Sequence, residues 1–381
     1  MIQSRAEQSR AEQSRAEQSR AEQSRAEQSR AEQAHNYNLV DLCKWVMAIF
    51  VVALHGHPFV DISADWDYYI SGVLTRLAVP YFFMVSGFFL FSKMPIGKIS
   101  WERIKRYCIR LGKIFLAWTI MYMPIAVYAV WHENNHFHKL LAIMRDTIFQ
   151  GALMYHLWYL YASIVAVLTL YFLFSRGLKL SVIIVIALLL HIIPVIAYSY
   201  HGIYIQYLAD IGIIKVFIAL FSKIFIPANG WTIGLLYMSV GGLFAWHRNR
   251  YSLTILLPLL VIALAGFCAE SYLIREYSLI NPNDQGNILS YMMLLLVTLL
   301  FLWSINVNLK DNPIYKHLRE QSLFIYLVHP WFLFLSTGIA KKALHIENYH
   351  MGVFLATVVL SIIAAEFLRK LCKYKRFSWL G

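Results

Sequence analysis

Four ionisable side chains stand in two otherwise apolar segments, and they are the first candidates for chemistry. Residues 38–57 carry Asp41 and Lys44 near one end and His55 at the other, about 20 Å away if the segment is helical. Arg76 stands in the next apolar segment, about 10 Å from its beginning. Because an ionisable group inside a membrane-spanning helix costs about 2.5–3.5 kcal/mol, each such residue is a functional candidate.

Each of these residues also has a purely structural interpretation. Asp41 and Lys44 are three residues apart, so they can form an ion pair on one face of a helix. The Arg76 guanidinium can bind a developing oxyanion, orient a neighbouring group, or only extend to the outer lipid headgroups. These alternatives stay open. The dipeptide Ser86–Gly87 indicates close packing of helices rather than a nucleophile, because no base stands beside it in the sequence.

The composition predicts a membrane protein. The chain is 59% hydrophobic and only 14% charged, with a mean hydropathy of +0.54, whereas soluble domains carry about 25% charged residues. The apolar residues fall in runs of about 17–25, which match a hydrocarbon core of about 30 Å. We therefore expect an all-α polytopic protein of about ten transmembrane helices. They lie near residues 39–57, 69–92, 109–130, 152–174, 180–198, 231–246, 252–269, 288–305, 321–340 and 351–369.

The charged residues predict the orientation of these helices. Lysines and arginines gather in every second loop, as is typical of cytoplasmic loops. They include Lys93, Lys98, Arg103, Lys105, Arg106, Arg110, Arg176, Lys179, Arg248, Arg250, Lys310, Lys316, Arg319 and Arg369. The alternate loops carry acidic residues, with Lys341 and Lys342 as a small exception. We expect both termini in the cytoplasm, and the net charge of +13 then requires no nucleic acid as a partner.

The two ends of the chain differ from the membrane domain, which we place at residues 38–371. Residues 1–37 form a polar tail in which residues 4–33 are six copies of Ser-Arg-Ala-Glu-Gln, disordered or helical but without a packed core. Residues 372–381 form a basic cytoplasmic tail. Because the first 33 residues are wholly polar, we expect no cleavable signal peptide. The pentapeptide can be encoded by the five-base unit AGCAG, whose gain or loss shifts the reading frame, so we hypothesise an on/off expression switch (phase variation).

The cysteines predict neither a disulfide nor a metal site. None of the four is part of a Cys-x-x-Cys pair, and they lie far apart in the sequence. They are Cys43, Cys108, Cys268 and Cys372.

Short motifs along the chain, taken in their order and spacing, resemble the membrane-bound acyltransferase-3 family. They are Asp41–Lys44 with His55, Ala78–Leu90, Arg103–Arg106, His156–Leu160, Asn229–Gly234, Gly241–Gly242 and Ile325–Pro330. Each motif alone is common in apolar helices, but their order across residues 38–371 is specific. Lys44 departs from the family, because many members have arginine there; a lysine keeps the charge but cannot grip an anion in a bidentate way.

The resemblance implies transfer of an acyl group, usually acetyl from acetyl-CoA, to a hydroxyl of an envelope glycan. It makes His55 the essential histidine, and Arg103 and Arg106 part of donor handling. The spacing agrees, since Arg103, Arg106 and Arg110 share one face if their loop is helical, and arginine suits the phosphates of a coenzyme. Asp41 and Lys44 join this donor group. The alternative is that these charges only set the topology.

Three further residues are candidates for contact with the acceptor substrate. His156 and Trp158 begin the fourth helix near the outer face, where His156 is either a substrate contact or a structural histidine. His329 stands before Pro330, whose missing amide donor leaves a carbonyl free, so its structural role would be to cap that carbonyl. His55 itself could deprotonate the attacking hydroxyl or carry the acyl group transiently, with Arg76 beside it.

Three functions compete at this point. The first is an O-acetyltransferase of the bacterial inner membrane that acts on lipooligosaccharide, O-antigen or capsule, in a stand-alone form without an outer hydrolase-like domain. The second is a non-enzymatic transporter or flippase of lipid-linked sugars, and the third is an acyltransferase with a small acceptor such as an amino acid. The basic residues gather on one face rather than along a path through the membrane, which favours an enzyme. A switchable repeat would suit a gene that alters surface antigens.

Overall fold

The helices of the protein form one bundle. The computed structural model describes residues 36–131, 153–216, 230–248, 251–280, 290–346 and 348–374, with a few further positions between 138 and 147. Within this part every element is helical. Residues 1–35 of the repeat tail and 375–381 of the basic tail lie outside it, so the predictions for them stay predictions.

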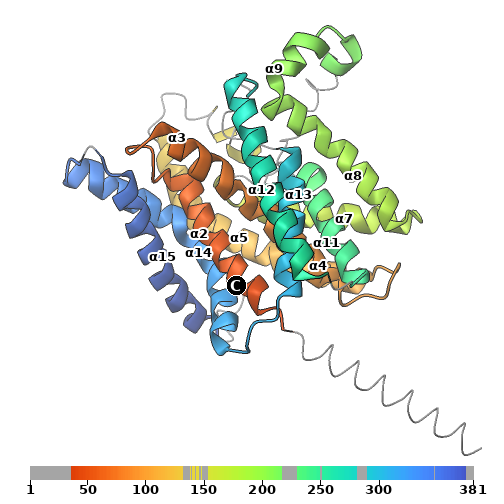
Figure 1. Ribbon diagram of the computed structural model, residues 1–381. Coiled ribbons are helices and arrows are strands. Elements are labelled where there is room, and N and C mark those ends of the chain that lie inside the picture. Colours follow the sequence, from red (N-terminus) through yellow and green to blue (C-terminus); the bar gives the residue numbers. More distant parts are fainter. Residues whose placement is uncertain are drawn as a thin grey trace, which may run out of the picture.

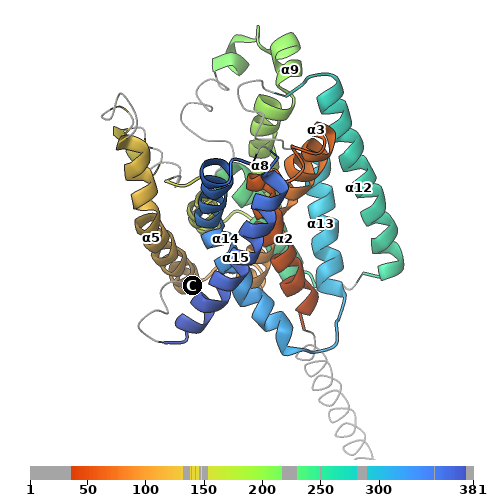
Figure 2. The same cartoon turned by 90° about the vertical axis from the view of Figure 1, so that its left-hand side faces the viewer.

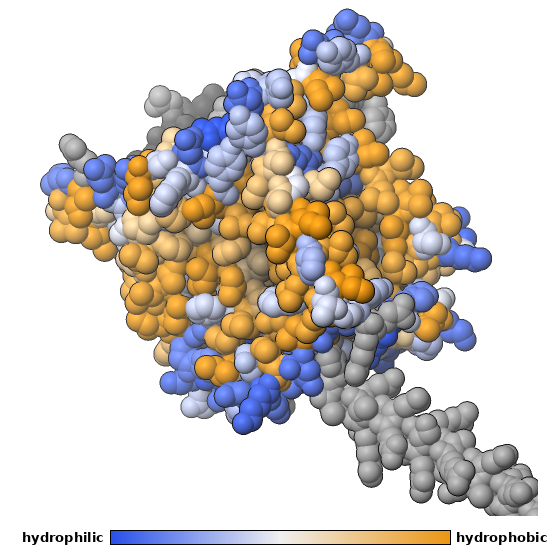
Figure 3. Space-filling model, viewed as in Figure 1, coloured by the Kyte–Doolittle hydropathy of each residue, from blue (hydrophilic) through white to orange (hydrophobic). Residues whose placement is uncertain are grey.

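Among the described residues, eight helices are long and apolar enough to cross a membrane, and two shorter apolar helices span Gly230–Trp246 and Tyr291–Asn306. The prediction of an all-α polytopic membrane protein is therefore confirmed. Figure 3 shows a broad apolar band across the visible face of the molecule, with hydrophilic side chains gathered above and below it. The exact number of spans and the side that faces the cytoplasm stay predictions.

Every predicted apolar segment contains a helix (Figure 1). The helices are α2 (Asn38–Gly56), α3 (Ala64–Trp66), α4 (Ala78–Phe91), α5 (Trp101–Trp131), α7 (Trp158–Ser175), α8 (Leu180–Pro194), α9 (His201–Ile203), α11 (Leu235–Trp246), α12 (Leu253–Glu276), α13 (Tyr291–Asn306), α14 (Pro313–Gly338) and α15 (His350–Leu371). Short π and 3-10 turns connect α3 to α4 through Asp67–Val73 and Leu74–Leu77.

Two helices begin about two turns earlier than predicted. α5 begins at Trp101 and α14 at Pro313, where the Asn312 side chain accepts a hydrogen bond from the amide of Ile314 (2.9 Å). Hydropathy detects only the apolar part of such a helix, because the polar turns that continue it into water do not contribute. As a result Arg103, Arg106 and Arg110 stand on a single helix, which is the condition that the predicted basic face required.

The start of α2 and the end of α15, the first and last described helices, both contact the N-terminal part of α14. Asn38 of α2 donates to Asp311 just before α14 (3.3 Å), and Arg369 of α15 donates to Glu320 within it (3.4 Å). The start of α2 and the end of α15 therefore lie on one face of the bundle, as the predicted topology requires. We call this the basic face, because the predicted basic loops lie on it.

Helices α4 and α11 pack backbone against backbone. A Cβ on Gly87 would overlap the carbonyl of Met238, and a Cβ on Gly241 would overlap the carbonyl of Met84. Small residues allow the two backbones to come this close. The resulting van der Waals contacts stabilise the helix pair, because a bilayer provides no hydrophobic driving force between helices. Of the predicted packing pair Ser86–Gly87, the glycine therefore packs as expected, whereas the Ser86 hydroxyl pairs with that of Tyr159 (3.1 Å).

Replacing Gly87 with alanine is expected to destabilise the fold by about 1–3 kcal/mol or more, because the opposing atom is backbone and cannot turn aside. Gly112 on α5 is the matched control, since nothing lies within 4 Å of a Cβ there. Thermal unfolding of the purified proteins in detergent measures the difference. Equal midpoints for Gly87→Ala and Gly112→Ala would contradict this packing.

Helix α5 packs on α7, and at Tyr122 it also contacts α14, where the tyrosine hydroxyl donates to the carbonyl of Leu327 (2.7 Å). In Figure 2 the N-terminal part of α5 is separated from the ribbons of α14 and α15. Residues of all three helices line the space between α5 and the α14–α15 pair. The fold therefore positions a cavity beside the helix that carries the arginine motif.

Candidate active site

Three histidines from distant parts of the chain meet inside the bundle. His55 ends α2, His156 precedes α7 and His329 lies in the middle of α14. The imidazoles of His55 and His329 are stacked, with centroids 5.5 Å apart and planes 12° apart, and His156 meets His329 edge to face at 5.2 Å. All three were predicted site residues. We call them the histidine cluster.

The ring of His329 is held in a defined tautomer. Its Nδ1 lies 2.8 Å from the carbonyl of Tyr326, which is the carbonyl that Pro330, four residues on, cannot reach with an amide. Because a carbonyl only accepts, Nδ1 carries the proton and Nε2 presents a lone pair. That Nε2 is buried and has no hydrogen-bond partner among the described residues. The predicted capping role is confirmed, and it leaves a buried base nitrogen on the ring that contacts His55 and His156.

Two further side chains adjoin His55. The ring of Tyr155 lies 4.3 Å from that of His55, and sequence reasoning missed it because only the fold brings this segment to α2. Arg76 is close enough to interact electrostatically with His55, and its Nε donates to the carbonyl of Gly72 (2.6 Å). Arg76 is therefore held against the preceding turn of its own helical segment, within electrostatic range of the histidine.

The segment that follows His55 is tied down by three aspartates. Asp61 pairs with His350 at the start of α15 (2.8 Å), Asp65 with Arg275 of α12 (2.6 Å), and Asp67 with His57 (2.8 Å). The backbone amide of His350, which donates to Asp61, holds the pKa of that carboxyl below its usual range. These contacts lie on the face opposite to the basic face and hold the end of α2 in place.

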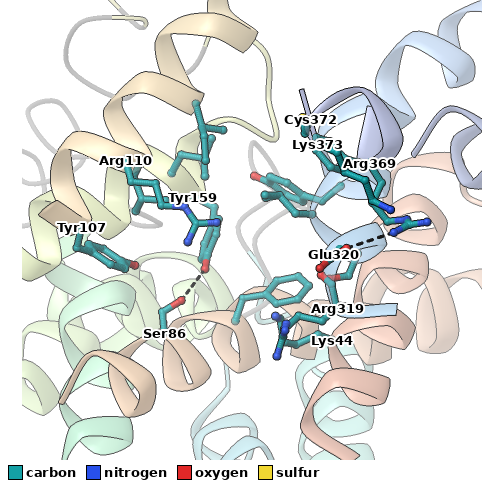
Figure 4. Close-up of a pocket in the computed structure, with 18 residues that line it drawn as sticks. Lys44, Ser86, Tyr107, Arg110, Tyr159, Arg319, Glu320, Arg369, Cys372 and Lys373 are labelled. Atoms are coloured by element: carbon teal, nitrogen blue, oxygen red, sulfur yellow. Dashed lines mark hydrogen bonds and ion pairs between the residues drawn. The ribbon is translucent and has the colours of Figure 1, made fainter. Parts of the chain in front are cut away.

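Two adjoining cavities of about 530 and 480 Å³ lie at the other end of the bundle. Figure 4 shows the first of them. Both are lined by Lys44, Phe82, Ser86, Tyr107, Arg110 and Tyr159, so we treat them as one space, the basic cleft. Its basic residues are Lys44, Lys93, Arg103, Arg106, Arg110, Arg319, Arg369 and Lys373. Predicted donor residues from α2 and α5 are thus brought together.

The two walls of the basic cleft differ in charge balance. On the α14–α15 wall, Arg369 is paired with Glu366 (2.8 Å) and Arg319 with Asp41 (3.3 Å). Within the described part of the chain, no ion pair joins Arg103 or the other α5 arginines to a carboxylate. Guanidiniums without carboxylate partners suit phosphate groups. Figure 4 shows Arg110 facing the opposite wall across the cleft.

Two predicted placements differ from the structure. Asp41 is paired with Arg319 of α14, and no ion pair joins it to Lys44 in the described part of the chain. Lys44 instead lines the cleft. Trp158 packs against Phe83 in the core, with centroids 6.1 Å apart, and lies outside both the histidine cluster and the cleft lining. The surroundings of the Trp158 side chain are therefore the apolar side chains of the helix core, and not the predicted substrate site.

Tyr326 is the residue that the cleft and the histidine cluster share. It lines the cleft, and its ring lies 5.4 Å from that of His156 and 6.3 Å from that of His329. The motif Ile325–Pro330 contains this tyrosine, but nothing in the amino-acid sequence indicates where its ring lies.

A family model for an acyltransferase domain matches residues 37–366, so the chain belongs to the acyltransferase-3 family. It is similar to an amino-acid racemase of Enterococcus faecalis, with 28% identity over 356 residues, which are 90% of this chain and 47% of that protein. A serine/alanine racemase of Enterococcus gallinarum is 25% identical over 325 residues, 85% of this chain and 44% of that protein. The chain thus spans less than half the length of these curated relatives. No solved structure is significantly similar to it.

Proposed function

We propose that this protein transfers an acetyl group from acetyl-CoA to a hydroxyl of a cell-envelope glycan, at a bacterial inner membrane. The observation that supports it best is the pairing of a basic cleft on one face with a histidine cluster deeper in the bundle, joined by Tyr326. An acyltransferase with an anionic cytoplasmic donor and an acceptor at the outer face needs both features.

The donor would bind in the basic cleft. The phosphates of acetyl-CoA are anionic, and Arg103, Arg106 and Arg110 offer charge-assisted hydrogen bonds from one helix. Lys44 adds a point charge from α2, and Ser86 and Tyr159, whose hydroxyls lie 3.1 Å apart, offer polar contacts to the uncharged arm. A thioester on a long flexible arm can then extend toward the histidines.

At the cluster, the acceptor hydroxyl attacks the thioester carbon, so that a C–O bond forms as the C–S bond breaks. His55 takes the hydroxyl proton as a general base, and the leaving thiolate takes up a proton. In the alternative route His55 itself attacks and carries the acetyl group before the hydroxyl receives it. In both routes Arg76 stabilises charge on the carbonyl oxygen, and His329 contacts the acceptor through Nε2.

A small acceptor is the second candidate. The relatives in Enterococcus are named racemases of amino acids, so an amine or hydroxyl of an amino acid is an acceptor of matching chemistry. The same basic cleft and histidine cluster would serve this reaction. The two candidates differ in the product and not in the catalytic groups.

The O-acetyl content of the surface glycan tests the proposal. Mass spectrometry should find an acetylated species in cells with the intact gene, and none in cells with a deletion or with His55→Ala. Survival of that species after deletion would remove the glycan acceptor, and acetylated amino acids would then be measured in the same three strains. Survival in His55→Ala alone would remove only the role of that histidine.

The repeat tract adds a proposal about expression. If the five-base unit AGCAG encodes residues 4–33, loss or gain of one unit silences the gene in part of a population. Sequencing the tract in single colonies tests this: uniform AGCAG units that vary in number are expected, whereas mixed synonymous codons would exclude the switch.

A further inference from the structure

The basic cleft ends at the ring of Tyr326. On the cleft side, this ring lies 5.9 Å from Tyr159 and 6.5 Å from Phe82, which both line the cleft. On the far side, its neighbours are His156 and His329. The Tyr326 ring therefore contacts the cleft lining on one side and the histidine cluster on the other.

The hydroxyl and the backbone carbonyl of Tyr326 both form hydrogen bonds on the side of the histidines. Its hydroxyl donates to the backbone carbonyl of His156, and its own carbonyl accepts the hydrogen bond from Nδ1 of His329. The first bond fixes the ring and the second fixes the histidine tautomer. Movement of the Tyr326 side chain would break the first bond while the second, made by the backbone, persists.

The histidine cluster is closed on the side of the cleft. The side chains of His156 and His329 are 2% and 0% exposed, and neither they nor His55 line the cleft. On the other side of His55, Tyr155 is 43% exposed. The arrangement is therefore closed toward the cleft and open toward the opposite face.

We propose that Tyr326 is a gate between the basic cleft and the histidine cluster. The proposal rests on the proposed function, because a thioester bound in the cleft must pass this ring to come near His55. The closed ring keeps a thioester that is bound in the cleft away from the cluster. With the gate absent, water replaces the acceptor: it adds to the thioester carbon, the C–S bond breaks, and acetate and free thiol are released. Tyr326 is in this sense a positioning residue.

Accessibility of a cysteine beyond the gate tests this without any need for acyl transfer. Tyr155→Cys places a thiol next to His55, and the native Cys372 lines the cleft as an internal control. A membrane-impermeant maleimide is applied to vesicles that present the basic face outward, and modification at each cysteine is read by mass spectrometry.

Cys372 should be modified in every protein, whereas the thiol at position 155 should react only when the gate is opened. Tyr326→Ala should raise its rate of modification by about tenfold or more, and Tyr326→Phe, which keeps the ring and loses one hydrogen bond, by a smaller factor. Tyr237→Phe, a buried tyrosine of α11 whose hydroxyl has no partner within the described chain, should change nothing. Unfolding in detergent should expose the thiol equally in all variants. Equal modification with and without Tyr326, at any level, overturns the gate.

A second readout separates the gate from the proposed function. With purified protein and acetyl-CoA but no acceptor, Tyr326→Ala should release free thiol several-fold faster than the unchanged protein, while its transfer to acceptor falls. A proportional fall of both rates contradicts the gate. Absence of any thiol release from the unchanged protein, with or without acceptor, contradicts the proposed function, and the maleimide result then still decides the gate.

Discussion

Replacing His55 with alanine is expected to lower the rate of acyl transfer by about 10²–10⁴-fold, the range typical for loss of a general base. The imidazole contacts the rings of Tyr155 and His329, and no hydrogen bond joins it to another residue in the described part of the chain, so the variant should assemble normally. Steady-state rates with saturating donor and acceptor measure the effect. If His55 is the group that removes the hydroxyl proton, the loss appears in kcat rather than in the KM of the donor.

His247→Ala is the matched control. This exposed histidine directly follows α11, on the basic face. Its ring contacts none of the three histidines of the cluster. It should leave kcat unchanged. A folded His55→Ala protein with a rate close to that of His247→Ala would contradict the assignment.

The double variant Arg103→Ala/Arg106→Ala is expected to raise the KM of the donor by about 100-fold. Each charged hydrogen bond to a phosphate contributes about 1.5–3 kcal/mol, which corresponds to at least a tenfold change in affinity for each arginine. Because these residues line the cleft and not the cluster, kcat at saturating donor should change little. The measurement is the dependence of the rate on donor concentration.

Two further variants make this result specific. Arg176→Ala removes a charge from the same face, but Arg176 stacks on Phe172 (4.9 Å) and does not line the cleft, so donor KM should be unchanged. Arg103→Lys/Arg106→Lys keeps the charge and loses the bidentate geometry. Its KM for the donor should therefore lie between that of the unchanged protein and that of the double alanine variant. An equal effect of Arg176→Ala would mean that the arginines act only through topology or overall charge.

Much of the fold follows from periodicity and charge in the sequence. Each of the apolar runs predicted to span the membrane contains a helix in the described part of the chain, because a run of that length can satisfy its backbone in a bilayer only by forming one. The helix starts at Trp101 and Pro313 were missed, since they lie in polar turns that hydropathy does not detect. The arginine face of α5 was predicted on the condition that its loop be helical, and the structure meets that condition.

The candidate site was only partly predictable. His55, His156 and His329 each stood out as polar residues in apolar surroundings, and the fold brings them together. What the sequence could not provide is pairing across distant helices. The partner of Asp41 is Arg319, 278 residues further along, and local spacing offered Lys44 instead. Tyr155 and Tyr326 matter through their positions, which only tertiary structure determines.

The most direct test of the whole account follows the acetyl group itself. Purified protein in lipid nanodiscs is given acetyl-CoA with an isotopically labelled acetyl group, together with envelope glycan, and the label is traced by mass spectrometry. We expect the label to move from the thioester to a base-labile ester of the glycan, with one free thiol released for each ester formed, and His55→Ala to slow both by the factor given above. Label that stays on the coenzyme in the presence of folded protein and every offered acceptor would contradict it.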